Sequence, residues 1–345
     1  MISEAIKKVV AGESLSENEA KQTMAEIMEG LATQAQIAGL LTALHLKGET
    51  VEEITGFTRT MRSKVTPVAT QRRRVVDTCG TGGDGANTFN ISTASAFVLA
   101  GAGLPVAKHG NRSVSSKCGS ADVLEYLGVA VSLTPEEAGH CLDKVGISFL
   151  YAPLLHGAMK HAAAPRKELG IRTVFNILGP LTNPAFAERQ VLGVYSADLV
   201  PVLAQVLANL GSKKSFVIHG CGGVDEISLA GAALVYEVAD GKVSRMTLDP
   251  AEYGLPRSPV AALAGGDVKM NARIIKNILE GASGPRRHAV IINAALGLIA
   301  GGLTNDLAVA VRLAGDVIDS GKARKKLKEL VEFSQSLVGR RIAAR

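Results

Sequence analysis

The stretch that decides the fold is Asp77-Thr-Cys-Gly-Thr-Gly-Gly-Asp-Gly-Ala-Asn-Thr-Phe-Asn-Ile-Ser-Thr93. Val75 and Val76 precede it as an apolar lead-in typical of a buried strand, and an apolar helical pattern begins directly after it at Ala94. A strand, a glycine-rich loop and a helix start together place free backbone N–H groups around an anion. The alternative is a flexible turn without a ligand, but a plain turn does not need the hydroxyl and amide side chains that surround this loop. Four glycines fall within it: Gly80, Gly82, Gly83 and Gly85.

The composition indicates a large folded chain without disulfides. The sequence has 345 residues, of which 47% are hydrophobic, enough for two domains or one large one. Its four cysteines include no CxxC pair, so neither a zinc site nor a disulfide framework is indicated. No uncharged apolar run reaches about 18 residues, and the first residues lack the apolar core of a signal peptide. We therefore expect a cytoplasmic protein without a membrane partner.

The net charge of +6 leaves two kinds of partner to consider. A basic chain can bind nucleic acid. The densest basic clusters, at 72–74 and 324–328, match no nucleic-acid motif and are typical of a solvated linker or helix face. A polyanionic small molecule fits the charge as well, and we expect no nucleic-acid partner.

Residues 1–65 are predicted to form short helices, each with its own start signal. Capping boxes, in which two side chains satisfy each other's backbone N–H groups, begin at Ser16, Thr33 and Thr50. Apolar residues follow at helical spacing. Because such short helices bury little surface alone, we expect a small helical domain or an oligomer surface, followed by a linker at 66–74.

From Val75 the pattern changes to alternating strands and helices, which predicts a largely parallel sheet with helices on its faces. In such sheets ligands lie beyond the carboxyl ends of the strands, where the glycine loop would be. Another capped helix start lies at Thr134, and the chain returns to helices from about 268 to 338. The predicted strands are 74–78, 105–109, 128–132, 147–150, 190–195, 214–219, 233–238 and 243–248. The predicted helices are 93–102, 119–127, 135–144, 198–210, 271–281, 286–300 and 305–320.

A second polar loop, from Lys108 to Asp122, also follows a short strand and precedes a helix. It combines cations, hydroxyls and glycines, which indicates a second anion site; the alternative is a polar surface loop. A third candidate is the pair Asp225 and Glu226, which follows a strand and a glycine turn. Adjacent carboxylates suit Mg²⁺ shared with substrate phosphates, although by themselves they are more typical of a solvated turn.

A fourth candidate is Arg166, which follows a proline at an apparent helix start. Arginine is the natural partner for a planar carboxylate. From this stretch alone a surface ion pair is the more typical interpretation.

These stretches together resemble the anthranilate phosphoribosyltransferase family. The resemblance runs in order over essentially the whole chain. It rests on 77–84, on Asn90-Ile-Ser-Thr, on Lys108-His-Gly-Asn-Arg, on Gly119-Ser-Ala-Asp, on 172–184 and on the Asp225–Glu226 pair. No departure is found at a position that aligns with these motifs.

The resemblance implies an α/β fold in which a large domain, 71–345, has a mostly parallel central sheet flanked by helices. A small all-helical domain would span 1–70 and be rejoined by about 165–190. The resemblance also implies a homodimer through the helical domains, Mg²⁺ as cofactor, and phosphoribosyl pyrophosphate and anthranilate as substrates in tryptophan biosynthesis.

The family's site residues carry over onto the matching positions of this chain. Anthranilate would be lined by Gly80, Asn111 and Arg166, with His109 and His156 as further neighbours. The implied magnesium ligands are Ser92, Asp225 and Glu226. The residues implied to surround phosphoribosyl pyrophosphate are Gly80, Gly83, Asp84, Thr88, Asn90, Ile91, Ser92, Thr93, Lys108, His109, Gly110, Asn111, Arg112, Ser113, Ser115, Ser116 and Ser120.

No compact pair of histidine and carboxylate stands out in the sequence, and we expect no essential general base. Two alternatives remain at this point. A pyrimidine nucleoside phosphorylase has a related architecture, but its glycine loop normally reads Lys-His-Ser-Thr-Gly-Gly, whereas this chain has Thr78-Cys-Gly-Thr-Gly-Gly. A nucleic-acid-binding relative without transferase activity would explain the basic charge.

Overall fold

The computed structural model describes residues 1–113 and 117–343. Two predicted site residues, Ser115 and Ser116, lie outside these ranges. None of the helices in the described ranges combines the length and apolar character needed to cross a membrane.

A seven-stranded sheet forms the centre of the α/β lobe, with strand order β3-β2-β1-β4-β5-β6-β7. The first five strands of that order are parallel, and β6 and β7 add an antiparallel edge. Seven of the eight predicted strands are therefore confirmed. The strands are β1 (Val76–Gly80), β2 (Val106–Gly110), β3 (Ile147–Tyr151), β4 (Arg189–Gly193), β5 (Lys214–His219), β6 (Ala233–Ala239) and β7 (Lys242–Leu248).

The eighth prediction, a strand at 128–132, is wrong. Val129 and Val131 are buried as an alternating pattern demands, but no strand forms there. The backbone instead bonds to side chains of a helix: the Ala130 N–H donates to Ser334 Oγ at 3.0 Å, and Gln335 Nε2 donates to the Gly128 carbonyl at 2.9 Å. Since buried backbone groups need partners of some kind, the helix replaces the neighbouring strand.

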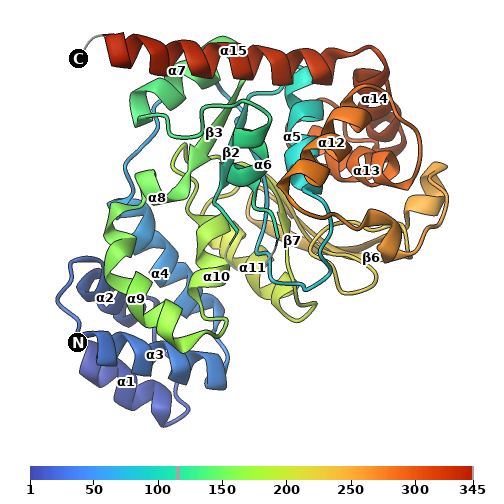
Figure 1. Ribbon diagram of the computed structural model, residues 1–345. Coiled ribbons are helices and arrows are strands. Elements are labelled where there is room, and N and C mark those ends of the chain that lie inside the picture. Colours follow the sequence, from blue (N-terminus) through green and yellow to red (C-terminus); the bar gives the residue numbers. More distant parts are fainter. Residues whose placement is uncertain (114–116, 344–345) are drawn as a thin grey trace.

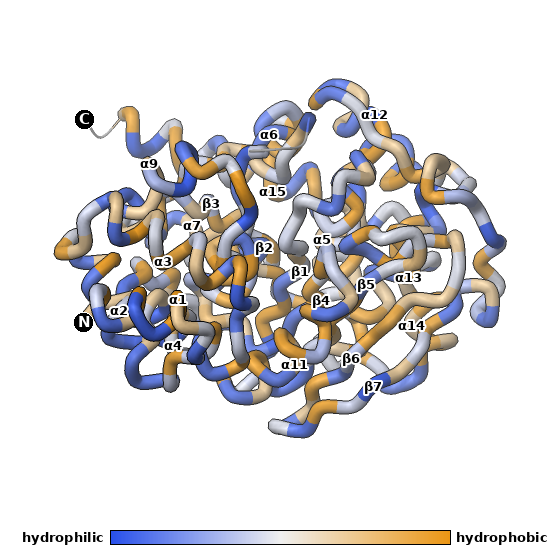
Figure 2. The backbone as a smooth tube through the Cα atoms, turned by 90° about the horizontal axis from the view of Figure 1, so that it is seen from below, coloured by the Kyte–Doolittle hydropathy of each residue, from blue (hydrophilic) through white to orange (hydrophobic). Residues whose placement is uncertain are grey.

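Helices cover both faces of the sheet (Figure 1). Successive side chains of a strand point to opposite faces. Val191 of β4 thus belongs to the apolar core with α5 and α13, whereas Leu192 belongs to the core with α11. Figure 2 shows apolar residues concentrated along the strands and α13. The helices of this lobe are α5 (Ile91–Gly101), α6 (Ser120–Tyr126), α7 (Pro135–Val145), α11 (Leu199–Asn209), α12 (Val268–Leu279), α13 (Pro285–Ala300), α14 (Leu307–Asp319) and α15 (Lys322–Ala343).

A helical lobe packs below the α/β lobe in Figure 1, and it is built from two separate parts of the chain. Its core contains residues of the first four helices together with Ala162, Val174 and Phe175, and it continues onto one face of β4 and β5. A division of the chain at residue 70 stays a prediction. The helices of the lobe are α1 (Ile2–Val10), α2 (Glu17–Met28), α3 (Gln34–Lys47), α4 (Val51–Lys64), α9 (Lys160–Leu169) and α10 (Phe175–Leu178), and the short α8 (Ala152–Leu155) leads into α9.

The predicted start signals are confirmed for four helices. Ser16, Thr33, Thr50 and Thr134 each complete a capping box with the residue three positions later. The expectation of a start signal for every N-terminal helix is wrong for α1, which has no side-chain cap. This helix is instead held by burial of three residues on one face, Ile2, Ala5 and Val9.

One cap has a larger role than its neighbours. Glu53 of α4 is fully buried and accepts hydrogen bonds from the backbone N–H of Thr50 at 2.8 Å and of Leu15 at 2.9 Å. Its carboxylate also pairs with Lys47 Nζ at 3.0 Å. This single side chain joins the end of α3 and the start of α4 to the loop before α2.

Replacing Glu53 by alanine is expected to lower the free energy of local opening of α4 by about 3 kcal/mol, because two backbone donors lose their acceptor and the half-buried Lys47 ammonium loses its carboxylate partner. Hydrogen exchange of the α4 amides measures this change. Glu52→Ala, an exposed position in the same turn, is the control and should change the value by less than about 0.5 kcal/mol. Equal effects of the two substitutions would contradict this role of Glu53.

Candidate active site

Two predicted loops meet at the carboxyl end of the parallel strands. The backbone N–H of Gly82, after β1, donates to Asp225 Oδ2 at 2.9 Å. Asp84 Oδ2 in turn accepts from the Asp225 N–H at 3.2 Å. The Ser92 N–H, at the start of α5, donates to Glu226 Oε1 at 3.0 Å. The glycine loop, the helix start and the carboxylate pair are thus one site.

Two physical reasons require the glycines here. Gly82, Gly83 and Gly85 have positive φ angles of 63°, 76° and 75°, which cost a residue with a side chain more than glycine. Gly80 does not have a positive φ angle, but a Cβ at this position would lie 2.4 Å from Asp225 Oδ2. Gly193, at the end of β4, was not singled out from the sequence, although a Cβ there would lie 1.6 Å from the Asp225 carbonyl oxygen.

The first turn of α5 keeps unused polar groups. Asn90 lies at the N-cap without capping it, because its side chain donates to the Cys118 carbonyl and accepts from Asn271 Nδ2. The Thr93 hydroxyl is buried without a hydrogen-bond partner among the described residues. Buried hydroxyls are normally paired, so this turn has capacity to bind an anion. Ile91 can contribute only its backbone, because its side chain is 1% exposed and lies in the core.

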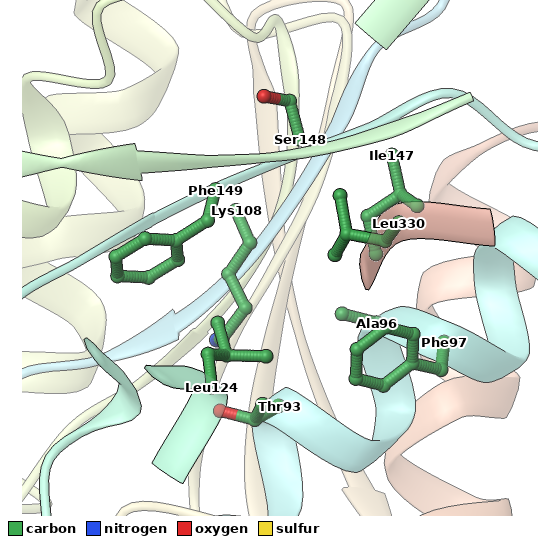
Figure 3. A pocket seen from close by; sticks show the side chains of 9 residues that line it. All are labelled: Thr93, Ala96, Phe97, Lys108, Leu124, Ile147, Ser148, Phe149 and Leu330. Atoms are coloured by element: carbon green, nitrogen blue, oxygen red, sulfur yellow. The ribbon is translucent and has the colours of Figure 1, made fainter. Parts of the chain in front are cut away.

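The side chain of Lys108, on β2, extends to the start of α5. Figure 3 shows its side chain extending past Phe149 toward Thr93. Its ammonium donates to the Thr78 carbonyl at 2.6 Å and to Ser92 Oγ at 3.3 Å. Burial lowers the pKa of Lys108, and Asp77 acts in the opposite direction. The adjoining void of about 10 Å³ in Figure 3 is too small for a substrate.

The carboxylate pair sits in a setting that favours a divalent cation. Burial, with the nearby Asp84, raises the pKa of Asp225 to about 7, and burial, with Asp225, raises that of Glu226 to about 8. A bound cation would stabilise both charged forms. Within residues 1–113 and 117–343, no group of three or more His, Cys, Asp or Glu side chains could hold a metal ion. Hydroxyl and substrate oxygens would have to complete the coordination, as is usual for Mg²⁺.

The loop after β2 is closed by its own contacts. Asp122 accepts from the backbone N–H of Gly119 at 2.9 Å and of Ser113 at 3.1 Å. Its other oxygen binds Arg112 Nη1 at 3.0 Å, and Glu125 binds the same nitrogen at 2.9 Å. One nitrogen of the Arg112 guanidinium, Nη1, is thus paired with two carboxylates. Gly110, which ends β2, lies close to the start of α6, since a Cβ there would lie 2.2 Å from the Ser120 hydroxyl.

Two histidines behind this loop form a neutral pair. The Nε2 atoms of His109 and His156 are 3.1 Å apart, so one donates and the other accepts. Burial lowers the pKa of His109 to about 3, with His156 adding to the shift, and burial lowers that of His156 to about 4. The structure thus brings together two residues that the sequence named only as further neighbours of anthranilate.

Arg166 differs from its sequence-based interpretation in two respects. It does not stand at a helix start, because α9 begins at Lys160 and Pro165 lies inside it. It also makes no ion pair with any described residue; its guanidinium lies 5.1 Å from the centre of the Phe175 ring, and burial lowers its pKa. The structure records no contact of Arg166 with Gly80 or Asn111 in the ranges it describes.

Two interactions at the site were missed by the sequence-based reasoning. Arg172 donates to the Gly83 carbonyl at 2.9 Å, and its guanidinium lies 4.5 Å from the centre of the Tyr195 ring. It therefore links the glycine loop to the returning segment, the part of the chain at about 165–190 that rejoins the helical lobe. Asp77 is fully buried and accepts from Asn183 Nδ2 at 2.8 Å and from the His109 N–H at 3.1 Å. A charged residue inside an apolar strand was the available signal.

Comparison with known proteins gives consistent matches over the whole chain. Residues 72–324 match the glycosyl transferase family a/b domain, and residues 3–65 match its helical bundle domain. The anthranilate phosphoribosyltransferase of Desulforamulus reducens is 78% identical over 344 residues, covering 100% of both chains. That of Pelotomaculum thermopropionicum is 62% identical and covers 98% of both.

Solved structures agree. The Thermus thermophilus enzyme superimposes with a TM-score of 0.91 at 44% identity, over 96% of this chain and 99% of that one. The Saccharomyces cerevisiae enzyme in complex with phosphoribosyl pyrophosphate and Mg superimposes with a TM-score of 0.88 at 29% identity, over 97% and 98% of the two chains.

The neutral histidine pair predicts a pH dependence of stability. Because the native pKa of His156 lies below its value in the unfolded chain, the unfolded chain binds more protons as the pH falls from about 6.5 toward 4, and stability is lost in that window. His156→Gln should therefore show a thermal midpoint that falls less than the wild-type midpoint between pH 7 and pH 5, by about 2 °C.

His140→Gln serves as the control, since His140 is exposed. Its thermal midpoint should fall with pH as steeply as that of the wild type. The same slope for His156→Gln would mean that the pair is not held neutral.

Proposed function

We propose, on the premise that this chain belongs to the anthranilate phosphoribosyltransferase family, that it transfers the 5-phosphoribosyl group of phosphoribosyl pyrophosphate to the amine of anthranilate. The products are N-(5-phosphoribosyl)anthranilate and pyrophosphate, in the second step of tryptophan biosynthesis from chorismate. The observation that carries this proposal is that the Asp225–Glu226 pair accepts hydrogen bonds from both the glycine loop, at Gly82, and the start of α5, at Ser92. The relatives named above support it, and none of them supports the phosphorylase or nucleic-acid alternatives.

Phosphoribosyl pyrophosphate binds between the first two loops in this proposal. The loop N–H groups, the first turn of α5 and the Lys108 ammonium supply the positive potential that phosphate oxygens require. The unpaired Thr93 hydroxyl supports this placement. Asp122 and Glu125 both bind Nη1 of Arg112, which leaves the other N–H groups of its guanidinium for a phosphate oxygen.

Mg²⁺ would be held by Ser92, Asp225 and Glu226 together with substrate oxygens, and it would neutralise charge on the departing pyrophosphate as a Lewis acid. The raised pKa values of the two buried carboxyls support this assignment, since a cation would offset their burial. The yeast relative solved with Mg is a further support.

The chemical step is a displacement at C1 of the ribose. The anthranilate nitrogen attacks C1, the bond from C1 to the pyrophosphate oxygen breaks, and the configuration inverts. The alkylated nitrogen then loses its extra proton to water or to the released pyrophosphate. An aromatic amine is neutral near pH 7 and needs no strong base to act as a nucleophile, so positioning of two substrates and stabilisation of the leaving group provide the rate enhancement. We assign no general base. The neutral His109–His156 pair is consistent with this, since two interlocked imidazoles of low pKa are poor proton acceptors near pH 7.

Anthranilate would lie between the two lobes, with Arg166 on the helical lobe and Gly80 and Asn111 on the α/β lobe. Arg166 has no carboxylate partner among the described residues, which leaves its guanidinium available for the carboxylate of anthranilate. The yeast relative solved with 4-fluoroanthranilate supports an acceptor of this class.

A cytoplasmic homodimer completes the proposal. Three apolar side chains of the helical lobe are strongly exposed, with relative exposures of 70% for Val10, 69% for Leu31 and 81% for Leu46. Exposed apolar side chains on one lobe are typical of a subunit interface.

Arg166 and Lys108 should have separable effects on the two substrates. Arg166→Ala should raise the KM for anthranilate about ten- to hundred-fold, the value of one lost charged hydrogen bond, and change the KM for phosphoribosyl pyrophosphate little. Lys108→Met should raise the KM for phosphoribosyl pyrophosphate by a similar factor and change the KM for anthranilate little. The loss of anthranilate fluorescence measures both, and unchanged circular dichroism verifies folding. No reaction by folded wild-type protein with Mg²⁺ and both substrates would overturn the proposal.

Removal of the carboxylate pair should change the metal requirement. Asp225→Asn combined with Glu226→Gln should raise the Mg²⁺ concentration needed for half-maximal rate at least about ten-fold. Glu252→Gln, an exposed carboxylate elsewhere, is the control. An unchanged Mg²⁺ requirement in the double variant would argue against the assigned ligands.

A further inference from the structure

A second cavity lies between α12 and the start of α13. Its volume is about 190 Å³, somewhat larger than a cavity of about 150 Å³ that holds benzene. Both helices belong to the end of the α/β lobe that is remote from the helical lobe (Figure 1). The residues that line it are Met270, Arg273, Ile274, Asn277, Ile278, Ala282, Ser283, Arg286 and Arg287.

The charge of this cavity is not balanced. Arg287 is neutralised by Asp319, with which it forms two hydrogen bonds of 2.6 and 2.7 Å. Arg273 is exposed and has no ion pair or hydrogen bond with any residue that the structure describes. Arg286 donates from Nη2 to the Ala264 carbonyl at 2.8 Å. Two positive charges therefore face the cavity without an acidic partner in the described chain.

Arg286 also carries an unmet hydrogen-bond donor. Its Nε is buried and finds no acceptor in the described parts of the chain. A buried donor of a charged group is costly to leave unpaired. The guanidinium as a whole lines the cavity, so its charge adds to that of Arg273 there.

The start of α13 adds to the positive potential. Gly284 is its N-cap and provides no side-chain acceptor, and Pro285 occupies the first turn. Helix geometry leaves the N–H groups of the next residues, Arg286 and Arg287, without an intrahelical acceptor. The start of a 16-residue helix also carries a partial positive charge that favours phosphate.

Part of the cavity lining is apolar. Ile274 and Ile278 of α12 contribute their buried side chains, and Met270 is 43% exposed at the rim. An inorganic ion would leave this part of the lining unused, whereas an organic anion with an apolar body would cover it. The volume restricts that body to about the size of one ring.

We propose that this cavity is a second anion-binding site, distinct from the active site, and that it takes a small organic phosphate with an apolar body no larger than one ring. Arg273, Arg286 and the start of α13 bind the phosphate, and Ile274 and Ile278 contact the apolar body.

Methyl NMR of the full-length protein tests the site with phenyl phosphate as the probe. Pyrophosphate and Mg²⁺ are kept saturating to occupy the active site. The methyl signals of Ile274 and Ile278 should shift saturably with a Kd below about 1 mM, while Ile91, at the start of α5, reports on the active site and should not move. Arg273→Gln should weaken binding about ten-fold, because it removes one charged donor.

The control is Lys276→Gln, which removes one exposed positive charge from the same helix outside the cavity lining. It should change the Kd less than about two-fold. The proposal is overturned if Ile274 and Ile278 show no saturable shift up to about 10 mM phenyl phosphate. It is equally overturned if only Ile91 shifts, or if Arg273→Gln binds as tightly as the wild type.

Discussion

The close approach of Asp225 to the ends of β1 and β4 is the constraint on which the site depends. Its carboxylate accepts from the Gly82 N–H, and its backbone lies so near Gly193 that no side chain could stand there. Gly80 is excluded from bearing a side chain by the same residue. This contact brings a loop 143 residues away in sequence onto the glycine loop. Without this contact, the carboxylate pair and the glycine loop would not share one site.

Around this contact the protein buries an unusual set of charges. Lys108, Asp77, Asp225 and Glu226 all lie in or behind the site, and burial opposes the charged form of each. Such groups are costly unless paired. Asp77 is paired within the protein through Asn183 and the His109 backbone, and its role is to hold the loops. The others have incomplete partners, which is the expected condition of residues that complete their interactions with substrate and metal.

The helical lobe and the returning segment serve a different purpose. Arg172 connects that segment to the Gly83 carbonyl, and Arg166 lies over Phe175 in the same part of the chain. The two lobes therefore meet at the glycine loop, and small changes in their relative position would alter the space for an acceptor. Four capping boxes and seven strands were correctly predicted because their causes are local. The strand at 128–132 and the position of Pro165 were not, because side chains of α15 and the extent of α9 decided them.

The sequence by itself determined which residue types are available: glycine loops after strands, a helix start rich in hydroxyls, a carboxylate pair and isolated basic residues. These follow from local periodicity and from the spacing of polar residues, whereas the family was indicated by the resemblance of the motifs that contain them. Only the tertiary structure decided which of them meet. It placed Asp225 on the glycine loop, paired Nη1 of Arg112 with two carboxylates and joined His109 to His156. The reason is physical: these contacts join segments separated by long stretches of chain, and the packing of the sheet, rather than any local preference, sets their distances.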